Sequence, residues 1–224
     1  VIGAAGDHDA PLLRRLVAGA GEDTGLRHSV RVPARSARIV SWPEWVPAAV
    51  REALGARGLV EPWSHQIRAA ELARDGHDVV IATGTASGKS LAYQLPVLAT
   101  FAADPRATAL YLAPTKALAA DQLRSVTELG LPDVRPSTLD GDTPTDARDW
   151  AREHARWLFS NPDMLHRSVL PRHVRWARFL RRLRYVVVDE CHGYRGVFGS
   201  HVALLLRRLL RVCARARAEH GPDA

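Results

Sequence analysis

The residues best suited to chemistry lie in two short stretches, each directly after an apolar run. Residues 82–90 read Ala-Thr-Gly-Thr-Ala-Ser-Gly-Lys-Ser, and residues 186–192 read Val-Val-Val-Asp-Glu-Cys-His. The first stretch offers amide groups, a lysine and a hydroxyl to phosphate groups. The second offers two carboxylates to a metal ion and a water. Together they predict an enzyme that hydrolyses a nucleoside triphosphate.

The first stretch fits the phosphate-loop pattern G-x-x-x-x-G-K-[ST], although Thr83 stands where the pattern has its first glycine. We expect its amides and the helix beginning at Gly88 to hold the β-phosphate. The lysine would contact the outer phosphates, and the last hydroxyl would bind Mg²⁺. The alternative is a chance turn before a helix, which the acid pair downstream disfavours. The predicted ATP-binding residues of this loop are Thr83, Gly84, Thr85, Ala86, Ser87, Gly88, Lys89 and Ser90.

The second stretch places an acid pair at the end of a predicted strand, where ligands of open α/β sheets collect. Asp189 is expected to hold Mg²⁺ together with Ser90, and Glu190 to orient and deprotonate the attacking water. His192 is expected to link this site with whatever lies across the cleft. A zinc site is disfavoured, because the chain has only two cysteines and no C-x-x-C pair. Cys191 is interpreted instead as a small apolar filler. The predicted catalytic residues are Lys89, Asp189, Glu190 and His192.

Composition sets the broad class of the protein. The chain has 224 residues, 46% of them hydrophobic, which suffices for one sizeable core. No apolar run reaches the roughly 18–20 residues of a membrane span, and no secretory signal is visible. With two cysteines, a cytoplasmic location is expected. The net charge of +7 favours polyanionic partners, although an arginine-rich composition alone also produces it. The start at Val1, without an initiator methionine, suggests part of a longer protein.

The order of predicted elements favours an α/β fold, a doubly wound parallel sheet with helices on both faces. Strands are predicted at residues 79–82, 109–113, 157–160 and 185–188, with a weaker one at 134–139. Helices are predicted at residues 88–101, 116–129, 144–152, 164–170, 174–183 and 200–218. Before them, residues 9–19 and 47–56 predict two short helices of an N-terminal arm. Trp42 and Trp45 are interpreted as anchors that pack this arm on the main domain, with base stacking as the alternative.

Several motifs in this order resemble superfamily 2 DEAD/DEAH-box helicases, with the box written here as Asp-Glu-Cys-His. Residues 63–66, Trp-Ser-His-Gln, resemble the glutamine motif, which implies that Gln66 reads adenine and that Trp63 packs on the base. Residues 113–119 with Gln122 resemble motif Ia. Ala86 departs from the usual Thr-Gly-Ser-Gly-Lys, which has glycine at that position. The resemblance implies a RecA-like sheet that binds ATP and Mg²⁺.

Three loops at predicted strand ends resemble those that hold a nucleic-acid backbone in this family. Amides at helix starts and hydroxyls that meet phosphates give a grip independent of base sequence. Ordinary helix capping by Thr115, Thr143 and Asn161 would use the same groups, so both interpretations stand. The implied nucleic-acid-binding residues are Pro114, Thr115, Lys116, Gly141, Asp142, Thr143, Asn161, Pro162 and Asp163.

The finer pattern, including residues 192–201, resembles the MrfA/SftH-like branch of DNA helicases. This implies a domain division into an arm at 1–57 and a first RecA-like domain at 58–224. It further implies that motif III and a second RecA-like domain with an arginine finger follow in cis in the full-length protein. DNA is the expected partner. An RNA helicase, a double-strand translocase and a non-catalytic nucleic-acid-binding module remain alternatives.

Two predicted helices rich in arginine give a weaker indication of nucleic-acid binding than these motifs. In the predicted helix at 174–183, apolar residues recur at i, i+3, i+4 and i+7, and they are expected to be core. The arginine faces here and in the helix at 200–218 are interpreted as solvated surface rather than as a track for DNA.

Overall fold

Four parallel strands form the centre of the fold, in the order β2-β3-β1-β4. They are β1 (Thr108–Leu112), β2 (Pro136–Thr138), β3 (Trp157–Ser160) and β4 (Leu183–Val188). In the central register, Leu110 lies opposite Leu158 on one side and Val186 on the other. Because all four strands run the same way, their carboxyl ends share one edge, and the loops that leave this edge can meet.

The computed structural model describes residues 28, 30, 38–83 and 88–220. Residues 38–83 and 88–220 belong to one compact unit, which extends from Arg38 to Ala224. The predicted helix at 9–19 lies outside the described residues. So do four predicted ATP-binding residues: Gly84, Thr85, Ala86 and Ser87.

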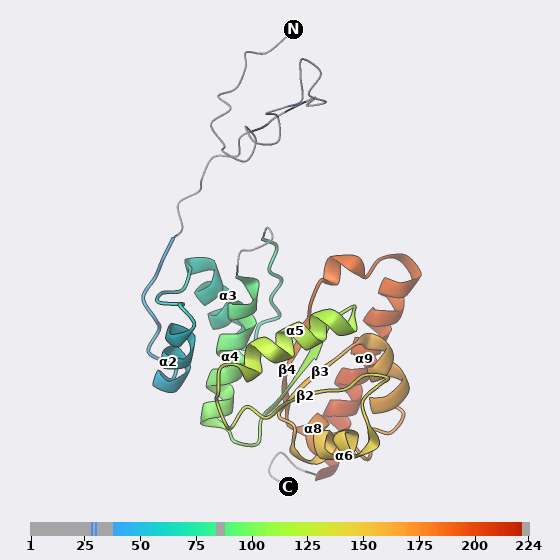
Figure 1. Cartoon of the computed structure of the whole chain (residues 1–224). Coiled ribbons are helices and arrows are strands. Elements are labelled where there is room, and N and C mark those ends of the chain that lie inside the picture. The colour runs from blue at the N-terminus through green and yellow to red at the C-terminus, as the bar shows by residue number, and fades with distance from the viewer. Residues whose placement is uncertain (1–27, 29, 31–37, 84–87, 221–224) are drawn as a thin grey trace, which may run out of the picture. The chain divides into compact units, whose positions relative to one another are not determined.

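One face of the sheet is covered by α2 (Ala48–Ala56), α3 (Ser64–Arg74), α4 (Lys89–Ala103) and α5 (Lys116–Thr127). In Figure 1, α2, α3 and α4 lie together on one side of the sheet, and α5 crosses the strands. Tyr111 and Trp157 on the strands pack against Leu95 and Val50 of these helices. Successive strand residues point to opposite faces, so every second residue of β1 belongs to this core.

The other face is covered by α6 (Thr145–His154), α7 (Pro162–Met164), η1 (Leu165–Val169), α8 (Ala177–Arg181) and α9 (Gly196–His220). Here Leu110 and Leu158 of the strands pack with Phe179, Leu180 and Leu205. A short 3₁₀ turn, η2 (Cys191–Gly193), connects β4 to α9. The prediction of an α/β sheet covered on both faces is confirmed. No helix within the described part of the chain is both long and apolar enough to cross a membrane.

The predicted strand at residues 79–82 is wrong. These residues form no strand, and the side chain of Val80 is 84% exposed. A strand needs a hydrogen-bonded neighbour, and among the described strands β4 pairs only with β1. An apolar run alone is therefore not enough to predict a strand.

The helices also differ from prediction in three places. α3 is not among the predicted helices. The helix predicted at 164–170 is a π-helix over most of its length. The helix predicted at 174–183 is reduced to α8, with turns before it, yet its apolar residues Trp176, Phe179, Leu180 and Leu183 are buried as expected.

Residues 38–57 pack on the main core. Val46, Val50 and Leu54 belong to the same buried cluster as the strands, and Trp42 and Trp45 pack against it. Trp42 Nε1 donates to the Val60 carbonyl at 2.8 Å. The interpretation of both tryptophans as packing anchors is confirmed. The boundary predicted at residue 57 stays a prediction.

The amino edge of the sheet is closed by a buried arginine. Arg156 is 3% exposed, and its guanidinium lies 4.3 Å from the centre of the Phe101 ring. It donates to four backbone carbonyls, those of Phe101, Asp104, Ala107 and Asp133. Burial lowers the pKa of this group, and the four carbonyls supply the partners that a buried cation needs. Arg156 thereby ties the starts of β1 and β2 to the end of α4.

Candidate nucleotide and nucleic-acid site

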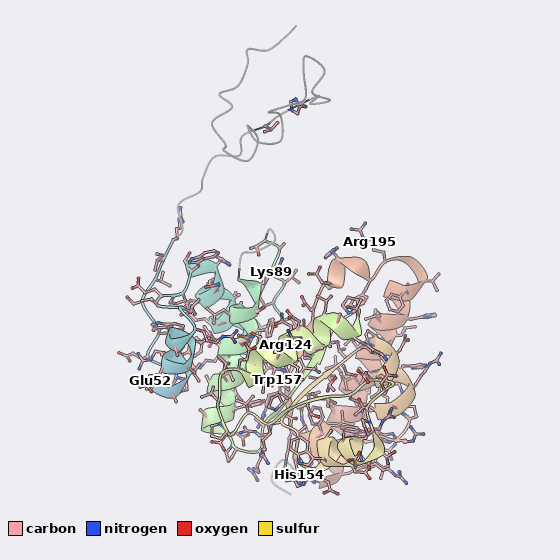
Figure 2. The ribbon with its side chains drawn as sticks, in the orientation of Figure 1. Glu52, Lys89, Arg124, His154, Trp157 and Arg195 are labelled. Atoms are coloured by element: carbon pink, nitrogen blue, oxygen red, sulfur yellow. The ribbon has the colours of Figure 1, made fainter. Side chains whose placement is uncertain are left out.

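The described residues of the phosphate loop lie at the carboxyl edge of the sheet. Figure 2 shows Lys89 and Arg195 at this edge, with His154 at the opposite one. Gly88 has φ of +63° and is the N-cap of α4, so the helix begins where the pattern predicts. Lys89 Nζ donates to the Thr83 carbonyl at 3.1 Å, which joins the two described ends of the loop. The lysine therefore lies beside the amides at the start of a 15-residue helix.

Gln66 connects the glutamine motif to this loop. Its Nε2 donates to the Gly88 carbonyl at 3.0 Å, and its Oε1 accepts from the Trp63 N–H at 2.7 Å. The second bond caps α3 from its third residue. Gln66 is 3% exposed, so its amide holds backbone in this structure. Trp63 is half-buried, with its ring centre 5.6 Å from that of His65. Their roles toward adenine stay predictions.

Asp189 is held by two hydrogen bonds at the end of β4. Its Oδ1 accepts from the Glu190 N–H at 2.9 Å, and its Oδ2 accepts from the hydroxyl of Tyr111. The Asp189 N–H donates to the Leu112 carbonyl at 2.9 Å, which continues the ladder with β1. Tyr111 is fully buried, and burial, then the neighbouring Tyr93 and Asp189, raises the pKa of its hydroxyl. Tyr111 therefore stays a donor at neutral pH and orients the carboxylate.

A second, partly buried tyrosine lies between the phosphate loop and the acid pair. Tyr93 donates to Gln122 Oε1 at 2.5 Å, and its ring centre lies 5.7 Å from that of Tyr111. Burial raises the pKa of Tyr93, an effect that the Ser90 hydroxyl partly offsets by hydrogen bonding. Ser90 and Asp189 thus both interact with this pair of tyrosines. The motifs do not predict a role for either tyrosine, although the hydroxyl of Tyr111 within the apolar run at 109–113 could have indicated one.

The acid pair continues into a strained turn. Glu190 has φ of +48°, an uncommon conformation for a residue other than glycine. Its Oε2 lies 3.2 Å from His192 Nδ1, and both side chains are partly exposed. This geometry presents the carboxylate to solvent and to its own histidine. The role expected of His192 across a cleft stays a prediction.

The cysteines behave differently from each other. Cys191 is exposed, so its interpretation as an apolar filler is wrong: the 3₁₀ turn carries it outward. Cys213 is buried in the core, where burial raises the pKa of its thiol to about 11. No group of three or more Cys, His, Asp or Glu suited to a metal ion occurs among the described residues.

The loop after β1 and the loop after β2 meet through an ion pair. Lys116 Nζ lies 2.5 Å from Asp142 Oδ2, and both side chains are largely exposed. Hydrogen bonding from Lys116 lowers the pKa of Asp142, and the same bond raises the pKa of Lys116. Pro114 and Gly141 are exposed in the same two loops. The structure thus brings two of the three predicted nucleic-acid loops together.

The predicted caps are partly present. Thr115 Oγ1 accepts from the Leu118 N–H at 3.3 Å, and Asn161 Oδ1 accepts from the Met164 N–H at 2.9 Å. Thr143 does not cap α6, because its hydroxyl donates to Asp140 Oδ1 and stabilises the turn instead. Of the third loop, Pro162 is buried and Asp163 exposed.

The donor set suits magnesium. Ser90 and Asp189 offer a hydroxyl and a carboxylate, and hard oxygen ligands of this kind are those that Mg²⁺ prefers. Lys89 and the start of α4 provide positive potential beside them. The described residues therefore fit a magnesium–nucleotide complex.

The sequence matches a known family over most of its length. Residues 63–218 match the DEAD/DEAH box helicase family. The ATP-dependent helicase YprA of Bacillus subtilis is 44% identical over 183 residues. The ATP-dependent helicase HRQ1 of Saccharomyces cerevisiae is 42% identical over 193 residues.

Solved structures agree with this relationship. The helicase MrfA bound to DNA and AMPPNP has a TM-score of 0.78 and 43% identity over 81% of this chain. The helicase Mss116 bound to single-stranded RNA has a TM-score of 0.66 at 19% identity, which shows the shared fold. The chain spans 24% of YprA, 18% of HRQ1 and 26% of the MrfA chain.

Proposed function

Because the chain belongs to the DEAD/DEAH box helicase family, we propose that it is the first motor domain of an ATP-dependent DNA helicase. The observation that carries the proposal is the convergence of Lys89, Ser90, Asp189 and Glu190 at one edge of the sheet. A phosphate-binding lysine and a metal-binding carboxylate must face the same nucleotide, and their position at a common edge supports this assignment. Gln66 joins this edge through its bond to Gly88.

The roles in ATP binding follow from the chemistry of each group. Lys89 pairs with the outer phosphates, and the amides at the start of α4 bind their oxygens. Ser90 and Asp189 would hold Mg²⁺, which would supply charge neutralisation at the phosphate oxygens when bound. Tyr111 keeps the Asp189 carboxylate in one orientation. Glu190, free of the bonds that hold Asp189, orients the attacking water and accepts its proton.

Nucleic acid is the proposed partner of the loops that leave the same edge. The helix starts capped by Thr115 and Asn161 present amides, and Lys116 presents a cation. DNA is the preferred substrate class, because MrfA was solved with DNA and shares 43% identity, whereas the RNA-bound relative shares 19%. A second motor domain in cis would complete the ATP site with an arginine, a contribution worth about 10³–10⁵ in rate in related hydrolases. The 224 residues alone are therefore expected to hydrolyse ATP slowly.

Binding tests the proposal without requiring turnover. The chain is titrated with a fluorescent ATP analogue, with and without Mg²⁺, as wild type, Lys89→Ala and Glu190→Gln. Wild type should bind in a Mg²⁺-dependent manner, and Lys89→Ala should bind about tenfold or more weakly, because a charge-assisted contact is lost. Glu190→Gln should bind like wild type. Absence of nucleotide binding to wild type, or full binding by Lys89→Ala, would refute the assignment.

A further inference from the structure

A groove separate from the nucleotide site lies between two helical segments on the second face of the sheet. Its volume is about 360 Å³, and Phe198, His201 and Arg208 of α9 line one wall. The other wall comes from Pro162, Asp163 and His166, at the end of the third predicted nucleic-acid loop. Pockets that bind small ligands begin at about this volume. The groove thus includes two residues of that loop, Pro162 and Asp163.

The groove is lined by residues that the nucleotide site does not use. Its floor contains Val202 and Leu205, at 4% and 7% exposure, whereas Phe198 is 45% exposed. The ring of Phe198 packs edge-on against Tyr194, with centres 5.5 Å apart. Gly199 permits this approach, because a Cβ there would meet the Tyr194 carbonyl at 2.4 Å. The aromatic ring is therefore held in place at the mouth of the groove.

The opposite wall has an unusual backbone. His166 belongs to η1, a π-helix of five residues. Such segments are rare in proteins, and those that occur often lie at functional sites. The deviation therefore points, independently of the cavity, to a role for this wall.

Charge decides which kind of occupant fits. α9 contains a single acidic residue, Glu219, which pairs with Arg215 at 2.6 Å. Arg207, Arg208 and Arg211 are exposed along the same helix. The opposite wall adds one exposed carboxylate, that of Asp163, so the arginines outnumber the acids around the groove. An apolar floor, aromatic and imidazole rings and an excess of positive charge are a combination that proteins use to bind single-stranded nucleic acid. An apolar protein segment would use the floor but would leave the arginines without partners.

We propose that the groove receives one unstacked base of a single strand whose backbone lies on the loop at 161–163. Phe198 stacks on the base, and Arg208 pairs with an adjoining phosphate. The inference rests on the proposed function, since it extends the path of the strand from the loops at the sheet edge. It adds a base-binding position to a set of proposed contacts that otherwise involve only the nucleic-acid backbone.

The test measures binding of a fluorescein-labelled single-stranded DNA to the chain by anisotropy, over a series of salt concentrations. Phe198→Leu keeps the apolar volume but removes the ring, and Phe198→Tyr keeps the ring. Val197→Ala is the matched control, because Val197 is 75% exposed and does not line the groove. Phe198→Leu should weaken binding about tenfold, since stacking on an aromatic ring contributes this much per base. Phe198→Tyr and Val197→Ala should bind within about twofold of wild type.

Salt dependence separates base contacts from phosphate contacts. Phe198→Leu should leave the slope of log K against log salt unchanged, whereas Arg208→Ala should reduce it by about one. If wild type binds and Phe198→Leu binds equally well, the groove is not a base site and the proposed function stands. That outcome would favour a protein segment as the occupant of the groove. If wild type does not bind DNA at all, both the proposed function and the proposed base site are wrong.

Discussion

The hydroxyl of Tyr111 donates to Oδ2 of Asp189, from the strand next to the one that carries the acid pair. Because the Glu190 N–H occupies Oδ1, both carboxylate oxygens are oriented by the protein. We predict that Tyr111→Phe lowers the Mg²⁺-dependent affinity for ATP about tenfold, since hydrogen bonds to charged groups contribute about 1.5–3 kcal/mol. Affinity without Mg²⁺ should change little. Nucleotide titration at several Mg²⁺ concentrations measures the effect.

The matched control for Tyr111→Phe is Tyr185→Phe. Tyr185 lies on β4 and its hydroxyl bonds Thr100 at 3.1 Å, so the substitution removes a comparable group away from the carboxylate. It should leave the Mg²⁺ dependence unchanged. Equal behaviour of the two variants would contradict the positioning role of Tyr111.

Two buried glutamines allow a second comparison. Gln66 uses both ends of its amide, whereas Nε2 of Gln94 has no hydrogen-bond partner among the described residues. Gln66→Leu should therefore lower the free energy of unfolding by about 1–3 kcal/mol, because the Trp63 N–H loses its acceptor and the Gly88 carbonyl keeps only the Leu91 N–H as a donor. Gln94→Leu should be neutral or stabilising, because it removes a buried amide with one end unpaired. Thermal denaturation measures both, and a destabilised Gln94→Leu would contradict the argument.

Much of the fold was predictable, because the strands are short apolar runs between clear helix signals. The strand at 157–160 agrees with prediction residue by residue, and β4 extends the predicted strand by only two residues. The run at 79–82 failed for a physical reason: apolar character predicts burial, but strand formation depends on a neighbour. α3 was not among the predicted helices; Gln66 caps its start, and Ile67, Ala69 and Ala70 are buried along it.

The candidate site was predictable as a set of motifs but not as a set of contacts. The phosphate loop and the acid pair meet because parallel strands place their carboxyl ends together. The tyrosines that connect them, Tyr93 and Tyr111, lie in segments that were predicted only as a helix and a strand. Nor could the sequence reveal that Lys116 pairs with Asp142, because that contact depends on how two loops approach each other.

Arg156 leads to a third prediction, about stability rather than activity. Removing its guanidinium takes a donor from four carbonyls, of which that of Asp104 still accepts from the Ala107 N–H. Arg156→Met should therefore lower the free energy of unfolding by at least about 3 kcal/mol. Arg178→Met is the control, because Arg178 is exposed and donates to the Glu153 carbonyl at 2.6 Å. It should change stability by about 0.5 kcal/mol or less. Urea denaturation of both variants measures the difference, and similar losses would show that Arg156 is not the tie between the strand starts.

The ion pair between Lys116 and Asp142 leads to the last prediction. Asp142 competes with a nucleic-acid phosphate for the same ammonium group, so Asp142→Asn should raise affinity for single-stranded DNA about two- to fivefold. Lys116→Ala should instead weaken binding and reduce the salt slope by about one.

Acidity should reproduce part of the Asp142→Asn effect. The pKa of Asp142 is lowered by its bond with Lys116, so the pair persists at neutral pH and is lost only as the pH falls through that depressed value. The gain in DNA affinity from Asp142→Asn should therefore be constant from pH 6 to 8, because even pH 6 lies about two pH units above the ordinary pKa of aspartate. It should shrink in more acidic buffer as wild-type Asp142 itself becomes neutral. Anisotropy titrations across this range measure both effects. Weaker DNA binding by Asp142→Asn would instead mean that the carboxylate positions Lys116 for the phosphate.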